Sequence, residues 1–255
     1  KETLNIMQRL YENHKVLTYP RTDSRYLSKD IVPTIKDRLE ACGTGPYRKL
    51  AMTAKKKDLS GKLAFVNDAK VSDHHAIIPT EQFVDLSHMT NEERKIYDLV
   101  VRRFLAVLYP PFEYEQTQVT VKVGGETFLA SGKIVKAQGW RAAYEEEVYS
   151  AEDEEEEEAY ESGKSLKGQT LPELEKGQEI KGLVLSLTEG KTKPPAHFNE
   201  ATLLSAMENP TAYMESHDKA MAKTLGETGG LGTVATRADI IEKLFKSFLL
   251  EKRGK

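Results

Sequence analysis

The sequence contains a single cysteine, Cys42, among its 255 residues. One thiol excludes an intrachain disulfide and a structural zinc site built from several cysteines. No apolar run approaches the roughly 20 residues that a membrane-spanning helix requires, and the apolar core of a secretory signal peptide is also missing. We therefore expect a soluble protein of the reducing cytoplasm with no membrane partner.

The sequence also lacks a P-loop of the form GxxxxGK followed by Ser or Thr, so we predict no use of ATP within the chain. Its composition is that of a globular protein, with a hydrophobic fraction of 39%. A chain of 255 residues can build one large domain or two to three smaller ones, each with its own core. We expect it to be a monomer.

The net charge of −3 is spread unevenly along the chain. Residues 1–109 carry 19 Lys and Arg against 14 Asp and Glu, residues 110–195 carry 10 against 18, and residues 196–255 carry 8 against 8. The differences are therefore +5, −8 and 0. Local charge steers charged partners, so the first segment favours a polyanion. Surface lysines that only maintain solubility explain the same charge equally well.

Several segments have helical spacing of apolar residues. Thr3 is a candidate N-cap of a first helix, and a second is expected from Ser28. The clearest helix starts at Thr90 and Glu93, which form a capping box. Its apolar stripe is expected at Ile96, Val100, Phe104 and Val107. Two more helices are expected after Asn199 and after Thr236, the last with Ile240, Ile241, Leu244, Phe245 and Phe248 as its apolar residues.

The period changes to two in "VTVKV", and "ETFLASGKIV" follows Gly124 and Gly125, which favour a hairpin turn. Alternation returns at Leu183, Leu185 and Leu187. We therefore expect antiparallel β structure over residues 110–195, between helical segments at 1–109 and 196–255. The predicted fold class is a mixed α and β, multidomain protein.

An acidic segment interrupts the β region, with ten Asp and Glu residues between Glu145 and Glu158. Such a run repels itself and offers few apolar residues for packing, so residues 145–163 are expected to form a solvated loop. A metal site is the alternative, but consecutive carboxylates in a flexible run lack the fixed convergent geometry that a divalent ion requires.

Chemistry is concentrated in "LTYPRTDSRYLS", residues 17–28. A tyrosine hydroxyl has a pKa of about 10, so Tyr19 needs a positive neighbour to act as a nucleophile, and Arg21 is such a neighbour. If the electrophile is a phosphodiester, the guanidinium can bind its non-bridging oxygens. An ordinary turn, with a buried tyrosine and two surface arginines, Arg21 and Arg25, is the alternative.

A second segment, "SDHHAIIPT", places His74 and His75 before a short apolar step and a proline. Imidazole titrates near neutral pH, so either histidine can donate to a phosphate or move a proton. A purely structural histidine pair is the alternative, and a metal site is a weaker one.

Four segments occur in the order seen in type IA DNA topoisomerases: "LTYPRTDSRYL", "DHHAIIPT", "KPPAHFNEATLLSAMEN" and "GLGTVATRADIIEKL". The sequence resembles that family, and within it the bacterial topoisomerase III branch, over nearly the whole chain except the acidic segment. The resemblance implies transient cleavage of single-stranded DNA, strand passage and religation without ATP. DNA, chiefly single-stranded, is the partner it implies.

The resemblance also assigns site residues. Tyr19 matches the tyrosine that attacks one DNA strand and stays joined to the 5′ phosphate, and Arg21 matches the arginine that contacts that phosphate. His74 matches a histidine near the same phosphate, whereas His75 stands where relatives often have an acid. Arg25 and His75 are further candidates for DNA contacts.

In the last motif, Thr233, Thr236 and Arg237 occupy positions that the family uses near the DNA backbone, although Thr233 replaces an arginine of the topoisomerase I branch. Thr236 is also the expected helix cap. The two roles are compatible because a helix N-terminus offers N–H groups to a phosphate.

The family fold is a four-domain torus. By resemblance, residues 1–109 correspond to the helical tyrosine domain, 110–195 to a β arch that acts as gate and hinge, and 196–255 to part of a helical base. The family's Toprim domain, which binds Mg²⁺ through a glutamate and a DxD motif, would precede residue 1. We therefore expect no metal ligands within this chain, and no DNA relaxation by the chain alone.

Two other functions are open to the same residues. A rolling-circle endonuclease also uses a tyrosine, but it needs two histidines that flank one apolar residue, whereas His74 and His75 are adjacent. A non-catalytic winged-helix DNA-binding module, in which Tyr19 is merely packed, is the remaining alternative.

Overall fold

The computed structural model describes residues 2–144, 171, 174–182, 184–214, 224–225 and 229–253. The chain divides into two compact units. Unit 1 comprises residues 1–51, 58–101 and 196–255, and unit 2 comprises residues 52–57 and 102–195. Within the described residues, no helix has the length and apolar character needed to cross a membrane. The predicted three-segment division of the chain stays a prediction.

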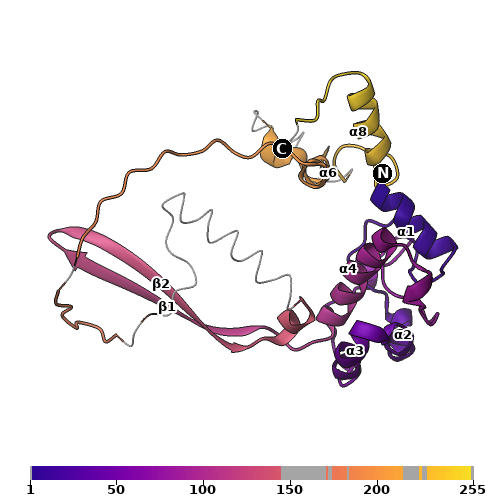
Figure 1. Ribbon diagram of the computed structural model, residues 1–255, viewed down its shortest axis with the longest axis horizontal. Coiled ribbons are helices and arrows are strands. Elements are labelled where there is room, and N and C mark those ends of the chain that lie inside the picture. Colours follow the sequence, from indigo (N-terminus) through magenta and orange to yellow (C-terminus); the bar gives the residue numbers. More distant parts are fainter. Residues whose placement is uncertain are drawn as a thin grey trace. The chain divides into compact units, whose positions relative to one another are not determined.

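The N-terminal part of unit 1 is helical (Figure 1). Helix α1 covers Glu2–Glu12 and buries Ile6 and Leu10. Thr3 lies inside this helix, so the prediction that it caps the helix is wrong. A local cap pattern marks a helix start only when no helical residue precedes it, and here Glu2 is already helical.

The helix expected from Ser28 begins as a tighter 3₁₀ helix, η1, at Lys29–Thr34, and continues as α2, Ile35–Cys42. Pro33 lies inside η1, where its ring nitrogen has no proton to donate to a helical hydrogen bond. The short elements that follow are η2 (Gly45–Tyr47), α3 (Arg48–Ala54), η3 (Asp68–Lys70) and η4 (Leu86–His88).

The core of unit 1 includes Cys42, whose side chain is buried at the end of α2. Ile35 and Leu39 on the same helix are also buried. Removal of the thiol from water disfavours its charged form and raises the pKa of Cys42 to about 12. The thiol is therefore neutral at physiological pH and packs as a small apolar group.

Helix α4, Asn91–Val107, confirms the predicted capping box. The backbone N–H of Glu93 donates to Thr90 Oγ1 at 3.2 Å, and the N–H of Thr90 donates to Glu93 Oε2 at 2.9 Å. The buried stripe differs from the expected one: Ile96 and Val100 are only half-buried. The buried residues are Glu93, Tyr97, Val101, Phe104, Leu105 and Ala106.

The carboxylate of Glu93 is buried with two basic partners. Arg9 Nε lies 2.8 Å from Glu93 Oε1, and His14 Nε2 lies 3.4 Å from Oε2. The hydrogen bond from Arg9, followed by that from the Thr90 N–H, lowers the pKa of Glu93 to about 2. This cluster therefore ties α1 to the first turn of α4 inside unit 1.

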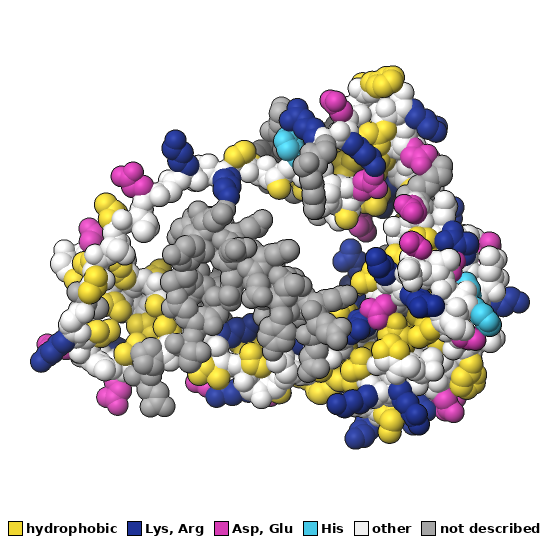
Figure 2. Space-filling model, in the orientation of Figure 1, with side chains coloured by type: hydrophobic (Ala, Val, Ile, Leu, Met, Phe, Trp, Pro, Cys, Tyr) yellow, Lys and Arg dark blue, Asp and Glu magenta, His cyan; other side chains and the backbone are white. Residues whose placement is uncertain are grey.

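Unit 2 contains a long antiparallel hairpin of β1, Glu113–Val123, and β2, Glu126–Ala137 (Figure 1). Gly124 and Gly125 form its two-residue turn at φ +58° and +88°, the left-handed region that glycine reaches without a steric penalty. The predicted hairpin is confirmed. Hydrophobic side chains gather over β1 and β2 in Figure 2, and several, including Leu129 and Val135, are exposed.

The strand expected at Leu183, Leu185 and Leu187 is not formed by the described residues of that segment. Residues 184–199 have no regular secondary structure, and Val184 and Leu187 are 92% and 94% exposed. Alternation alone cannot form a strand, because a strand needs a partner edge, and within the described residues β1 pairs only with β2. The acidic segment 145–163 lies outside the described residues.

The C-terminal part of unit 1 contains α6, Glu200–Glu208, which starts with a capping box between Asn199 and Thr202. The expected helix after Asn199 is thus confirmed. After η6, Pro210–Tyr213, the last helix is α8, Arg237–Lys246. Phe248 lies beyond the end of α8, at φ +58° and 93% exposed, so its expected place on the apolar face is wrong.

The Glu93 cluster makes the stability of unit 1 dependent on pH. The pKa of Glu93 is lowered on folding, so its contribution is complete above the unfolded value of about 4.5 and is lost as pH falls toward about 2. We expect Glu93→Gln to lower the free energy of unfolding by about 2 to 3 kcal/mol near pH 7, because it leaves Arg9 and His14 without the carboxylate.

Urea unfolding followed by circular dichroism measures this effect. Glu92→Gln is the matched control, since Glu92 is exposed in the same helical turn, and its stability should stay within about 0.5 kcal/mol of the parent. Equal losses in the two variants would contradict the assigned role of the cluster.

Candidate active site

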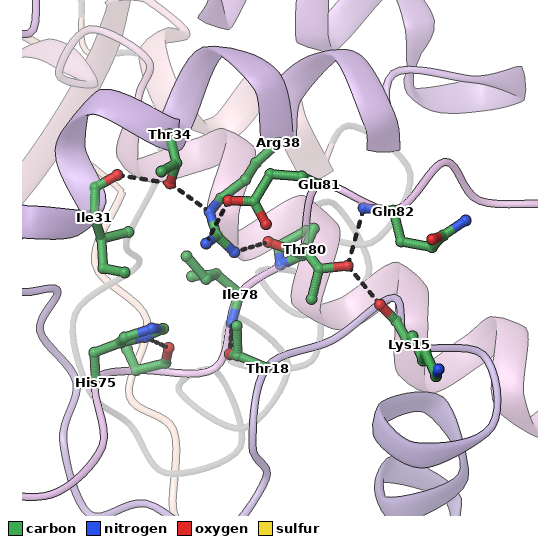
Figure 3. A network of polar contacts seen from close by, with 12 residues as sticks. Lys15, Thr18, Ile31, Thr34, Arg38, His75, Ile78, Thr80, Glu81 and Gln82 are labelled. Carbon is green, nitrogen blue, oxygen red and sulfur yellow. Dashed lines mark hydrogen bonds and ion pairs between the residues drawn. The ribbon is translucent and has the colours of Figure 1, made fainter.

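The tyrosine segment and the second histidine segment lie side by side in unit 1. Leu17 and Pro79 form an isolated antiparallel bridge. The N–H of Thr18 donates to the carbonyl of Ile78 at 3.0 Å, and the N–H of Ile78 donates back to Thr18 Oγ1 at 3.0 Å. Figure 3 shows Thr18 and Ile78 paired in this way. The pairing fixes the backbone one residue before Tyr19.

A second set of contacts joins the two segments beyond Tyr19. The hydroxyl of Thr22 donates to the carbonyl of His74 at 2.9 Å. The N–H of Ala76 donates to the carbonyl of Tyr26 at 2.8 Å. Tyr19 and His74 are therefore enclosed between main-chain contacts on either side, which limits how far apart the two side chains can move.

The rings of Tyr19 and His74 are in contact at a tilted angle. Their ring centroids are 4.4 Å apart and the rings are inclined by 42°. On the other side, the Tyr11 ring meets Tyr19 edge-on, with centroids 5.5 Å apart. Tyr19 is half-buried and His74 is exposed. The phenol is thus held in one orientation by two rings and still reaches solvent.

Tyr19 and His74 line a cavity of about 420 Å³, together with His75. The other lining residues are polar or acidic except Val71: Thr18, Ser28, Asp30, Asp68, Ser72 and Asp73. His75 Nδ1 lies 2.7 Å from the carbonyl of Ala76, so that ring is engaged with the backbone. His74 is therefore the histidine whose ring contacts the phenol ring.

The carboxylates of the cavity do not form a metal site. Among the residues that the structure describes, no three His, Cys, Asp or Glu side chains converge as ligands. Asp68 is engaged by Lys29, whose N–H donates to Asp68 Oδ1 at 2.8 Å, and this contact lowers the pKa of Asp68. These residues do not fit a divalent cation, so no chemical step is assigned to one in this cavity.

The two arginines of the tyrosine segment are exposed and weakly held. Arg21 Nη1 donates to the carbonyl of Ala235 at 3.5 Å, a long hydrogen bond. Arg25 Nη2 lies 3.8 Å from Glu208 Oε2, an exposed ion pair that contributes little. The described contacts of Arg21 thus reach the last motif rather than the Tyr19 phenol.

The last motif is organised by Arg237, which is buried at the start of α8. Its guanidinium donates to the carbonyls of Leu231, Gly229 and Gly232. Gly230 has φ +88°, and a Cβ there would lie 2.2 Å from the Met207 carbonyl, so only glycine fits. Arg237 is therefore used inside the glycine-rich loop.

Thr233 and Thr236 are exposed at the N-terminus of α8. The N–H of Thr233 donates to Thr236 Oγ1 at 2.9 Å, and the two hydroxyls are 3.0 Å apart. Thr236 precedes the helix as predicted, but its hydroxyl does not bond the N–H groups of the helix. The first-turn N–H groups of α8 therefore lack this side-chain cap.

Comparison with known proteins decides the family. Residues 1–255 match the family described as DNA topoisomerase. The chain belongs to the DNA topoisomerase family. It is 59% identical over 255 residues to DNA topoisomerase 3 of Bacillus licheniformis, 58% over 254 residues to that of Bacillus subtilis, and 60% over 255 residues to that of Bacillus thuringiensis.

All of this chain is covered in each comparison, but only 34% of each relative. The chain thus spans about a third of the length of the curated topoisomerases that it matches. Two thirds of each relative has no counterpart here, so the activity of the whole protein does not follow from family membership alone.

Arg38 in α2 is a residue that sequence reasoning missed, and Figure 3 shows its side chain beside Thr34 and Glu81. Its side chain is buried, with Nε donating to Thr34 Oγ1 at 2.7 Å, Nη1 to the carbonyl of Pro79 at 2.8 Å, and Nη2 lying 2.8 Å from Glu81 Oε1. Burial lowers the pKa of Arg38, and the Glu81 carboxylate opposes that shift. The sequence feature that could have identified it is its position next to Leu39, on the apolar side of the helix.

The contact between Arg38 and the Pro79 carbonyl holds the second motif where it pairs with Leu17. Figure 3 also shows Thr80, whose hydroxyl donates to the carbonyl of Lys15 at 2.6 Å. Arg38 is therefore a positioning residue: it holds the segment that carries the histidines against α2, and the bridge between Leu17 and Pro79 joins that segment to the one that carries Tyr19.

We expect Arg38→Lys to destabilise the protein by about 3 kcal/mol, because an ammonium cannot make three directional contacts in the plane of a guanidinium and leaves buried acceptors unpaired. Lys36→Arg, at an exposed site on the same helix, is the matched control and should be neutral. Thermal unfolding measures both variants. A stability of Arg38→Lys equal to that of the control would show that the guanidinium contacts do not hold the second motif.

Proposed function

We propose that this chain is the tyrosine-bearing part of a type IA DNA topoisomerase, which cuts one DNA strand through a 5′-phosphotyrosine intermediate and reseals it without ATP. The observation that carries the proposal is the ring contact between Tyr19 and His74 in an open cavity. A tyrosine with only a packing role needs no exposed histidine on its ring and no access to solvent. The high identity to proteins named DNA topoisomerase 3 supports the same conclusion.

The proposed step exchanges one phosphate ester bond for another. The phenolic oxygen of Tyr19 attacks the phosphorus of one phosphodiester and forms a new P–O bond, while the bond between phosphorus and the 3′ oxygen breaks. The phenol loses its proton and the leaving 3′ oxygen gains one, which gives a free 3′ hydroxyl. Because one phosphate ester replaces another, the bond energy is kept, and the reverse reaction reseals the strand.

Four side chains besides Tyr19 have proposed roles at the phosphate or on the DNA beside it. His74, whose ring contacts that of Tyr19, is the group proposed to pass a proton or donate to a phosphate oxygen. Arg21 is exposed, and in the part of the chain that the structure describes its side chain makes one long hydrogen bond, so it can turn toward the non-bridging oxygens when DNA binds. Arg25 and His75 are proposed to contact the DNA close by.

The last motif is proposed to contact the DNA backbone through Thr233 and Thr236, whose exposed hydroxyls lie at the N-terminus of α8. Arg237 has a different proposed role. Its guanidinium is committed to three carbonyls of the glycine-rich loop, so it shapes the surface on which the threonines stand.

The domain roles belong to the same proposal: residues 1–109 as the tyrosine domain, 110–195 as the β arch that opens the gate, and 196–255 as part of the base of a torus. Mg²⁺, when bound, would stabilise phosphate charge during religation, with ligands on a Toprim domain outside these residues. A cytoplasmic monomer that prefers single-stranded DNA completes the proposal.

Covalent trapping tests the chemistry in a protein of the relatives' full length that carries this chain. Single-stranded DNA labelled at its 3′ end should become attached to protein after a denaturing quench, whereas DNA labelled at its 5′ end should yield a shortened strand with a free 3′ hydroxyl. Tyr19→Phe should abolish both products, and Tyr11→Phe, which changes the neighbouring ring, should retain them. DNA binding without an adduct would instead support a non-catalytic DNA-binding module.

The 255-residue chain alone is expected not to relax a negatively supercoiled plasmid, because we assign the magnesium ligands to residues outside it. Agarose gel electrophoresis of the plasmid, with the full-length protein as positive control, measures this. If the chain alone relaxed the plasmid and Tyr19→Phe abolished this activity, the assignment of the magnesium ligands to residues outside the chain would be overturned.

A further inference from the structure

A cluster of aromatic rings and cations lies at the base of the hairpin in unit 2, where β1 begins, β2 ends and η5 (Gly139–Tyr144) follows. Its position in sequence is remote from every motif that carries the proposed cleavage chemistry. We call it the aromatic–cation cluster. Its members are Phe112, Tyr114, Lys133, Trp140, Arg141 and Tyr144.

The hairpin register brings Lys133 to the rings of β1. Lys133 pairs with Gln116, so Tyr114 is its diagonal neighbour on the same face. Lys133 Nζ lies 4.5 Å from the ring centroid of Tyr114 and 4.9 Å from that of Phe112. The two rings are 5.4 Å apart and inclined by 34°.

Gly139 allows the residues of η5 to reach the rings at the start of β1. Gly139 has φ +49°, and a Cβ there would lie 2.1 Å from the carbonyl of Pro111, so the chain can pass this close only as glycine. The residues that follow reach the same rings: Arg141 Cζ lies 4.1 Å from the centroid of Phe112 and 5.9 Å from that of Trp140. Phe112 is thus contacted by both cations.

The rings of the cluster remain accessible. Tyr114 is 48% exposed and Trp140 is 37% exposed, whereas Tyr97 in the core of unit 1 is 1% exposed. Trp140 meets Tyr144 edge-on at 6.2 Å. Large aromatic surface that stays in water next to cations is the composition of a site for flat, anionic ligands.

The hairpin and its immediate flanks carry an excess of positive charge, whereas residues 145–195 of the same unit carry 6 Lys and Arg against 15 Asp and Glu. Residues 102–144 carry six Lys and Arg against three Asp and Glu, and unit 2 also contains the exposed run Lys55–Lys57. Within the described residues, Lys133 has no ion pair, and its amine contacts the rings instead. Lys136, in contrast, lies 2.8 Å from Glu115. Lys133 is therefore the cation of β2 that is available to a phosphate.

We propose that the aromatic–cation cluster is a second DNA site, which binds single-stranded DNA by stacking bases on Trp140 and Tyr114 with phosphates against Lys133 and Arg141. Single strands fit because their bases are accessible for stacking, whereas a duplex presents mainly phosphates. The inference rests on the proposed function only in taking DNA as the partner. It uses no residue of the Tyr19 site.

Trp140 reports on this site directly, because it is the only tryptophan of the chain. Titration of the 255-residue chain with an oligo-dT strand should quench its tryptophan emission, and the quenching should weaken as salt rises. Double-stranded DNA of equal length should bind without comparable quenching. Anisotropy of the same oligonucleotide, labelled with fluorescein, measures total binding in parallel.

Tyr114→Leu should weaken the binding seen by quenching about fivefold or more, because it removes one stacking surface but keeps apolar volume. Lys133→Gln should weaken it and reduce the slope of log affinity against log salt by about 0.7, the value for one phosphate contact on a single strand. Lys122→Gln, at an exposed position near the hairpin turn, is the matched control and should leave quenching unchanged.

Tyr19→Phe separates this inference from the proposed function. It should abolish covalent trapping in the full-length protein while quenching of Trp140 in the chain stays intact. Unchanged Trp140 emission at saturating oligo-dT would overturn the second site, whether or not anisotropy detects binding elsewhere. Equal quenching by single-stranded and duplex DNA would overturn the stacking mechanism.

Discussion

The organisation of the candidate site depends on the main-chain pairing of two segments about 60 residues apart in sequence, joined at Leu17 and Pro79. Neither segment forms a long strand, so each is held by a few hydrogen bonds and by buried neighbours. The phenol of Tyr19 and the imidazole of His74 meet only because this pairing fixes both backbones. A nucleophile placed in this way is oriented before substrate arrives, which lowers the entropic cost of reaction.

Two buried charged side chains, Arg38 and Glu93, stabilise the helices of unit 1 that accompany this pairing. Arg38 reaches the Pro79 carbonyl from α2, and Glu93 ties α1 to α4 through Arg9. Neither group faces the cavity, yet both maintain the helices against which the two motifs lie. Buried ion pairs of this kind contribute little net stability when formed and much instability when broken. They favour one arrangement of the core over competing ones.

Local sequence signals predicted the parts of the fold whose causes are local. The capping box of Thr90 and Glu93 and the glycine turn at Gly124 depend on residues within a few positions, and both are confirmed. The buried face of α4 is displaced by one residue, to Tyr97 and Val101, because packing partners elsewhere in the chain decide which face is covered.

Non-local causes account for the failures. The alternation at Leu185 and Leu187 predicted a strand, but within the described residues it finds no partner edge. Arg38 was missed because only the folded structure brings the Pro79 carbonyl to it. In the site, the sequence predicted that Tyr19 and His74 act together, and the structure brings the two rings into contact. Their chemical roles, and those of Arg21 and the last motif, stay predictions.

The buried thiol of Cys42 can serve as a probe of local unfolding in unit 1. With a pKa near 12 and no solvent contact, this thiol has almost no thiolate to offer an electrophile while α2 stays packed. Cys42 is the only thiol in the sequence, so alkylation of the protein reports local unfolding that exposes this part of the core. The rate at which an alkylating reagent labels Cys42 therefore measures how often the core around α2 opens.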